Sequence, residues 1–321
     1  HDRGPGTWYV ALRGRAAAEI QKDAALRDGI EAFIDGSPAL RRQSPAAVYD
    51  AIARHVRETP RLRAQAEDPP ERPFLLRHGR SIVRFAWAAA RIAALALLAL
   101  LLWNAPAATL LTLAVLGALV WLARAHLLAL ERSDPVPPVS WDPRALKAAD
   151  GREDRSLQNH MCSVTDWKPG VFRAVLLRLS LRVVGLAHRF WFNQGDLGGI
   201  PTIHFARWIN LPENRELVFF SNFDGSWERY LGDFIDQASN GLNAIWSNTV
   251  GYPRTHLLTS GGARDEERFK SFARNSMWQT RAWYAAYRRL SVQNLLDDAA
   301  LRDGLARRPS GAALDAWLRL L

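Results

Sequence analysis

The chain has 321 residues, enough for about two domains, and its 42 lysines and arginines against 32 acidic residues give a formal charge of +10. Its single cysteine, Cys162, excludes an internal disulfide and a multi-cysteine metal site, and suits a reducing compartment. A basic chain binds an anionic membrane face or nucleic acid. Because the arginines are spread along the chain, we expect the lipid bilayer as the partner and no nucleic acid.

The first segment, residues 1–36, is predicted to be a short strand, Trp8 to Leu12, followed by a helix, Ala16 to Ile34. Its sequence recurs near the other end of the chain. WYVALRGRAAAEIQKDAALRDG at 8–29 aligns with WYAAYRRLSVQNLLDDAALRDG at 283–304, and the last seven residues of the two stretches are identical. An identical run at one fixed offset, with a second cluster of matches upstream at Trp8, Tyr9, Ala11 and Arg13, predicts two copies of one domain.

The two copies are unequal in this sequence. The second has a long run of residues before its strand and helix, whereas the first has almost none. We therefore expect that roughly 70 residues of the first copy lie upstream of His1 or come from another fragment. Residues 1–36 would then be the C-terminal remnant of that copy.

Residues 37–80 are predicted to be a helical linker. Ser44 is suited to cap a helix and Pro45 to begin it, and the apolar residues that follow continue at helical spacing to Val56. The stretch Glu67 to Pro73 is polar and proline-rich, so we expect a linker there.

Residues 81–131 contain two apolar runs, Phe85 to Trp103 and Ala107 to Leu122, with only three residues between them. Each run is close to the roughly 20 apolar residues that span a bilayer. Backbone groups in lipid must be paired within a helix or a closed barrel, so the runs predict a transmembrane helical hairpin. The alternative is a buried helical hairpin in a large soluble core.

Arginines flank the hairpin on both sides, and the turn between the runs has no lysine or arginine. The flanking arginines are Arg77, Arg80 and Arg84 before the first run, and Arg124 and Arg132 after the second. By the positive-inside tendency, we expect both flanks to be cytoplasmic and the turn to face outward.

Residues 132–194 are predicted to be a linker and an interfacial helix. Ser133 to Pro143 holds four prolines, and Arg144 to Asp166 has no clear pattern. Val171 to Phe192 is apolar apart from a stripe of arginines at helical spacing, which suits a helix in the headgroup region. The alternative is a soluble amphipathic helix with its arginines in water.

Residues 195–321 are predicted to form an α+β domain. Ile203 to Leu211 and Leu217 to Ser221 read as a strand hairpin, Ser226 as the cap of a helix that runs to Trp246, and Trp283 to Tyr287 as a further strand. Antiparallel strands mixed with helices predict a sheet covered by helices on one face. A second copy of the domain could then cover the other face.

Two motifs in this domain, Ile203 to Trp208 and Ser221 to Trp227, resemble a group of uncharacterised bacterial membrane-associated proteins. More remotely, the chain is similar to the dimeric α+β barrel superfamily of dye-decolourising peroxidases and chlorite dismutase-like proteins. That resemblance implies a duplicated ferredoxin-like fold, with the first copy truncated and the hairpin inserted, and haem as a cofactor. Dye-decolourising peroxidases carry a Gly-x-x-Asp-Gly motif. Asp224-Gly225 match the end of that motif, and Ser221 stands where its first glycine would be.

The strand hairpin is expected to bring candidate catalytic residues together. His204 and Arg207 lie on one strand, and Asn222 and Asp224 end the next. A histidine beside a carboxylate suits acid–base chemistry or axial ligation, so His204, Arg207 and Asp224 are the catalytic candidates. The alternative is structural: Asp224 and Asn222 shape the turn, and His204 is an ordinary sheet residue.

Three residues, Asn222, Arg254 and His256, are candidates for contact with a ligand or headgroup. No paired histidines or carboxylate cluster predict a metal site. The sequence thus predicts a membrane-anchored, cytoplasm-facing protein that binds an apolar or amphipathic ligand or a membrane partner. The alternatives are a haem- or lipid-directed oxidoreductase and a scaffold subunit of a larger membrane complex.

Overall fold

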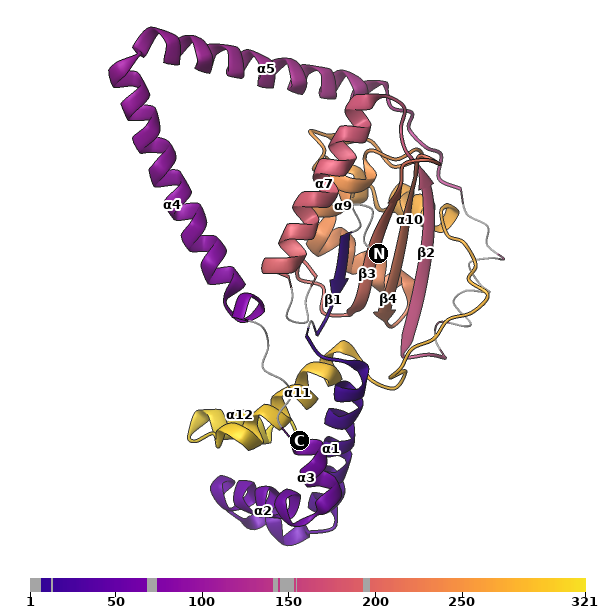
Figure 1. Cartoon of the computed structure of the whole chain (residues 1–321). Helices are drawn as coiled ribbons and strands as arrows, with labels where there is room; N and C mark the ends of the chain where they lie inside the picture. Colours follow the sequence, from indigo (N-terminus) through magenta and orange to yellow (C-terminus); the bar gives the residue numbers. More distant parts are fainter. Residues whose placement is uncertain are drawn as a thin grey trace.

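The computed structural model describes residues 7–12, 14–67, 74–140, 144, 153, 155–192 and 197–321. Arg13, residues 68–73 of the predicted linker and the start of the predicted α+β domain lie outside them. The described chain forms a sheet with helices on one face, a helical bundle at one end of the sheet, and a projecting pair of long helices (Figure 1).

One four-stranded antiparallel sheet organises the first of these parts. Its strands are β1 (Thr7–Val10), β2 (Gln158–Asp166), β3 (Ile203–Leu211) and β4 (Glu216–Asp224), in the order β1-β3-β4-β2. The predicted hairpin is β3 and β4, whereas β2 was not predicted. Two short strands, β5 (Thr255–His256) and β6 (Ser260–Gly261), form a separate hairpin.

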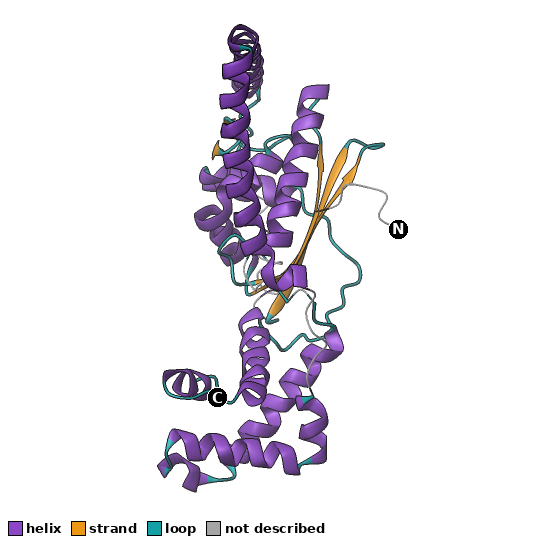
Figure 2. Cartoon of the chain, turned by 60° about the vertical axis from the view of Figure 1, so that its left-hand side comes forward, coloured by secondary structure: helices purple, strands orange, loops and turns teal. Residues whose placement is uncertain are grey.

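Alternate residues of the strands are buried on one sheet face, as the period of two requires. Tyr9, Trp208, Phe219 and Phe223 are each at most 3% exposed there. Residues of α7 (Val171–Phe190), α8 (Trp227–Asp233), α9 (Ser239–Trp246) and α10 (Glu266–Asn275) complete the core on this face. Figure 2 shows the helices gathered on one side of the strands. The predicted single helix from Ser226 to Trp246 is interrupted by a π-helical turn, η2 (Phe234–Ala238).

The opposite sheet face is only partly covered. Trp8 and Phe220 are 49% and 36% exposed on it, and Trp283 stacks on His160 with ring centroids 4.9 Å apart. The prediction of a strand from Trp283 to Tyr287 is wrong, because these residues form a loop. Tyr284 is 79% exposed, whereas its sequence counterpart Tyr9 is 1% exposed. The described residues contain one sheet of this size, so a duplicated ferredoxin-like barrel is not confirmed.

The helical bundle draws on both ends of the chain. Its members are α1 (Ala17–Asp35), the 3-10 turn η1 (Pro38–Arg42), α2 (Pro45–Glu58), α3 (Pro60–Ala66), α11 (Val292–Arg307) and α12 (Ala312–Leu318). Ser44 caps α2 as predicted, since its side chain accepts from the Ala47 amide. The bundle core includes Leu26, Ile52, Leu301 and Trp317.

The two repeated stretches meet in this bundle as α1 and α11. Asp23 pairs with Arg302 at 2.8 Å, and Arg27 pairs with Asp298. These are the same two positions of the repeat with the helices exchanged, because Asp23 aligns with Asp298 and Arg27 with Arg302. Each helix thus supplies the acid for one ion pair and the base for the other.

The projecting pair consists of α4 (Phe74–Asn104) and α5 (Pro106–Ser133). Their segments Ser81–Asn104 and Pro106–Ser133 have mean hydropathies of 2.2 and 2.0, and the apolar stretches that qualify them are 0% buried. They are long and apolar enough to cross a membrane, and the buried-hairpin alternative is not what the structure shows. The helices diverge from their turn toward opposite ends of α7 (Figure 1).

Candidate functional site

The structure brings His204 and Asp224 together but not Arg207. The His204 Nε2 atom lies 2.7 Å from Asp224 Oδ1, and Asp224 Oδ2 accepts from the Val292 amide at 2.8 Å, the first residue of α11. Both carboxylate oxygens therefore tie β4 to β3 and to α11, an arrangement that favours the structural alternative. Arg207 is exposed on the opposite face of β3.

The remaining candidates lie apart from this pair. Asn222 lies on the partly covered sheet face against Trp283, Arg254 donates through Nε to the Asp134 carbonyl, and His256 is exposed in β5. Haem does not fit at His204. The His204 residue is only 4% exposed, and its Nε2 atom already contacts Asp224.

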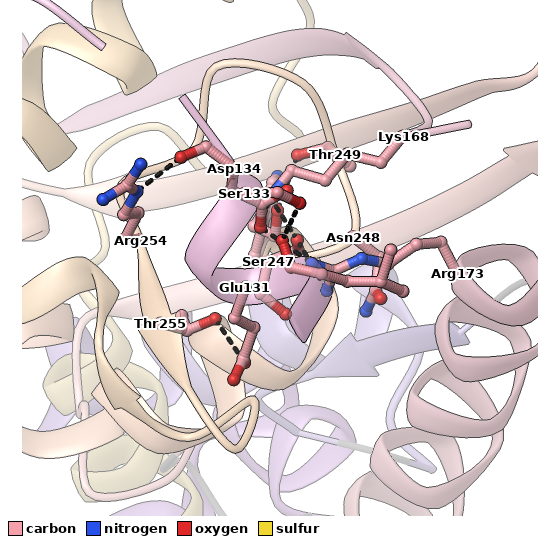
Figure 3. Close-up of polar contacts among 12 residues, drawn as sticks. Glu131, Ser133, Asp134, Lys168, Arg173, Ser247, Asn248, Thr249, Arg254 and Thr255 are labelled. Carbon is pink, nitrogen blue, oxygen red and sulfur yellow. Dashed lines mark hydrogen bonds and ion pairs between the residues drawn. The ribbon is translucent and has the colours of Figure 1, made fainter. Parts of the chain in front are cut away.

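A buried charge cluster at the end of α5 was not predicted (Figure 3). Asp134 Oδ2 lies 2.7 Å from both Lys168 Nζ and Arg173 Nη2, and Lys168 Nζ also donates to the Ser247 carbonyl at 2.8 Å. Burial lowers the pKa of Lys168, and the hydrogen bond to Asp134 opposes that shift. Ser247 directly follows α9, so Asp134 links the hairpin to α7 through Arg173 and to the end of α9 through Lys168.

Glu131, one turn earlier in α5, is held by the loop between β5 and β6. Its carboxylate accepts from the amides of Leu257 at 2.7 Å and Leu258 at 2.8 Å, and from Thr255 Oγ1 at 2.8 Å. Leu257 and Leu258 have φ angles of 51° and 64°, a left-handed backbone that is uncommon for residues other than glycine. We call Glu131, Asp134, Lys168, Arg173 and Ser247 the latch, because they fasten α5 to the sheet domain.

A pocket of about 490 Å³ lies between the C-terminal half of α7 and the η2–α9 segment. Ligand sites commonly have volumes of roughly 300–1,000 Å³. Its walls are mostly apolar, and polar side chains such as Gln237, Asn240 and Arg264 also line it. The apolar lining residues include Val183, Val184, Ala187, Phe192, Leu197, Trp208, Leu242, Ile245 and Trp246.

Two features of the wall suit a binding site. The π-helical turn η2 supplies Phe234, Gln237 and Ala238, and π-helical turns are frequent at functional sites. His188 is 5% exposed in the wall, with its ring 5.5 Å from Trp208 and 5.8 Å from Tyr9. The aromatic side of the pocket is therefore fixed by the packing of the sheet.

Helix α7 extends from this pocket to α4 and α5, which we call the membrane-type helices because they are long and apolar enough to cross a bilayer. Near its C-terminus Phe190 packs on Gly79, where a Cβ would come within 3.1 Å of the ring, two residues before the span that begins at Ser81. Near its N-terminus the Phe172 ring lies 4.9 Å from His126 of α5. Figure 1 shows α7 between the sheet and the opening of the hairpin.

The outward side of α7 carries an apolar stripe. Its members are 51–81% exposed and recur at helical spacing: Val171, Val175, Leu179, Val183 and Leu186. The arginines predicted to share one side of this helix, Arg178, Arg182 and Arg189, are exposed as well. Because Val183 belongs to both the stripe and the pocket lining, the stripe leads into the pocket.

Comparisons of the chain with protein-family models, with curated proteins and with solved structures each gave no match.

Proposed function

We propose that this protein is a membrane-anchored binding protein whose pocket holds an apolar or amphipathic molecule taken from the bilayer. One observation carries the proposal: α7, which forms a pocket wall, also joins the two ends of the hairpin and presents an apolar stripe. Apolar walls with polar groups at a few points are what an amphipathic ligand requires.

Helix lengths support a position of α7 flat on the membrane. Helices α4, α5 and α7 have 31, 28 and 20 residues. At 1.5 Å per residue their lengths are about 46, 42 and 30 Å, so a triangle with α7 as its base has a height of about 40 Å. A bilayer with its headgroups measures roughly 40–45 Å.

In this arrangement the hairpin crosses the bilayer and the stripe of α7 enters the headgroup region. Long side chains such as Arg178 and Arg182 keep their charged ends in water while their stems lie along the apolar surface. The distribution of arginines around the hairpin favours a cytoplasmic position for the sheet domain. The pocket would then open beside the leaflet that supplies its ligand.

Binding of a fluorescent fatty acid to the full chain in mild detergent tests the proposal. Gly241 lines the pocket on α9, and a Cβ there would meet nothing within 4 Å. Gly241→Phe should place a ring in the pocket without a clash and weaken binding about tenfold or more. Gly232→Phe is the matched control, because Gly232 on α8 also faces open space and is not among the lining residues. Equal binding by both variants and the wild type would rule out this pocket.

A second candidate function, that of a subunit in a membrane complex, is favoured by the partly covered sheet face. Trp8, Trp278 and Tyr284 are 49%, 67% and 79% exposed, and large exposed aromatic residues are enriched at protein interfaces. A partner that co-purifies at fixed stoichiometry with the wild type, but not with a Phe220→Glu variant, would support this role. If the Phe220→Glu variant retains the partner as well as the wild type does, the partner binds elsewhere.

A further inference from the structure

A second pocket, which we call the groove, lies at the opposite end of α7 from the ligand pocket. It has a volume of about 460 Å³ and is lined by Trp167, Gly170, Val171, Ala174, Arg178, Pro212, Glu213 and Arg215. Val171 belongs to the apolar stripe and is 81% exposed. The groove therefore lies beside the stripe that the proposed function places at the bilayer.

Two arginines of the groove are held by the surrounding structure. The Arg178 guanidinium lies 5.8 Å from the centroid of the Trp167 ring, within cation–π range. The Arg215 carbonyl accepts from the Trp167 amide at 2.8 Å, and Arg215 Nη2 donates to the Lys168 carbonyl at 3.4 Å. Glu213 is the one acidic residue in the lining, so the side chains of the groove carry a net positive charge.

The start of α7 adds further positive potential. Gly170 provides no side-chain cap, and the first turn of this 20-residue helix holds no acidic residue. The N–H groups at such a helix start favour an anion, as does the helix dipole. Trp167 is 6% exposed, and its Nε1 finds no acceptor among the residues that the structure describes.

We infer that the groove binds a phosphate group, with Arg178 and Arg215 as its charged contacts and the first amides of α7 as further donors. The phosphate could belong to an anionic lipid headgroup or be free in solution. Its location beside the stripe rests on the proposed function and favours the headgroup. A lipid held there would have its acyl chains next to Val171, in line with the stripe.

The test is native mass spectrometry of the full chain in mild detergent with dioctanoyl-phosphatidylglycerol or dioctanoyl-phosphatidylcholine, and a thermal-shift titration with inorganic phosphate. We expect the wild type to retain phosphatidylglycerol about tenfold better than the Arg178→Ala/Arg215→Ala variant does. Arg41→Ala/Arg42→Ala is the matched control, because it removes the same charge from exposed positions of the helical bundle, away from α7 and outside the groove lining. Its retention should equal that of the wild type.

The outcomes separate the two sources and the two proposals. Loss of phosphatidylglycerol in the groove variant alone supports a headgroup site, and loss of a phosphate-induced shift in that variant alone supports a site for free phosphate. Equal behaviour of the groove variant and its control in both assays overturns the inference. Because Gly241→Phe blocks only the ligand pocket, it should leave phosphatidylglycerol retention unchanged, and the groove variant should still bind the fatty acid.

Discussion

The Asp134 carboxylate lies 2.7 Å from the Lys168 ammonium, and this contact fastens the second membrane-type helix to the sheet domain. Lys168 in turn reaches the Ser247 carbonyl at the end of α9, which is a wall of the ligand pocket. The hairpin and the pocket are therefore joined by the buried ion pairs of Asp134 with Lys168 and Arg173. A shift of α5 relative to α7 would strain the pocket wall.

Asp134→Asn should destabilise the sheet domain strongly. Lys168 and Arg173 would remain buried without a counter-charge, and loss of one partner from a buried ion pair costs roughly 3–5 kcal/mol. Thermal unfolding of the full chain in detergent measures this. Glu58→Gln, at an exposed position of α2, should leave the unfolding free energy nearly unchanged. A similar melting temperature for both variants would show that the latch carries little energy.

The pH dependence of stability should contain a contribution from Asp23. Burial raises the pKa of this carboxyl to about 6, from 3.8, against the opposing effect of Arg302 and Arg15. A folded-state pKa above the unfolded value means that the folded chain binds the proton more tightly, so this contribution stabilises at low pH and is lost as pH rises from about 4 to 6. Denaturant unfolding over that pH range gives the unfolding free energy of the wild type and of Asp23→Asn. The value for the variant is subtracted from that of the wild type at each pH to give a difference curve. The curve should fall with rising pH, and a flat or rising curve would contradict the shift.

Gly304→Ala should destabilise the helical bundle although alanine is the better helix former. A Cβ at Gly304 would overlap the Trp317 ring, which is held by the hydrogen bond from its Nε1 to the Leu301 carbonyl at 2.9 Å. We expect a loss of about 1–3 kcal/mol from overpacking. Gly232→Ala, which faces open space in α8, should instead stabilise by up to about 1 kcal/mol. Chemical denaturation of both variants measures the difference, and a stabilised Gly304→Ala would contradict the packing at Trp317.

Hydropathy and spacing predicted the elements whose residues show a simple pattern. The hairpin, β1, α1, α2 and the β3–β4 hairpin follow from apolar runs and alternation. Strand β2 was missed because polar residues are buried there: Ser163 and the Ser276 hydroxyl form a hydrogen bond at 2.7 Å, and Gln158 donates to the Leu290 carbonyl at 2.6 Å. The free-energy cost of burying these polar groups is offset by hydrogen bonds to residues more than a hundred positions away, which a local sequence pattern does not reveal.

The sites depended even more on contacts between distant segments. The arginine spacing in α7 marked the right helix, but the pocket needs η2 and α9, and the π-helical turn has no signal that spacing detects. The aromatic run from Trp283 to Tyr287 predicted a strand, whereas the structure uses Trp283 to cover His160 on the open sheet face. Glu131 and Asp134 simply follow an apolar run in the sequence, and only their contacts in the structure reveal the latch.

Electron paramagnetic resonance of spin-labelled α7 in liposomes tests the central claim most directly. Labels would be attached singly through Leu179→Cys, Val183→Cys and, as the control on an exposed loop, Tyr284→Cys, each in a Cys162→Ser background. We expect oxygen to reach the labels at 179 and 183 more readily than a water-soluble nickel complex does, with the reverse order at 284. Greater access of the nickel complex at all three positions would place α7 in water and contradict a pocket that opens to the bilayer.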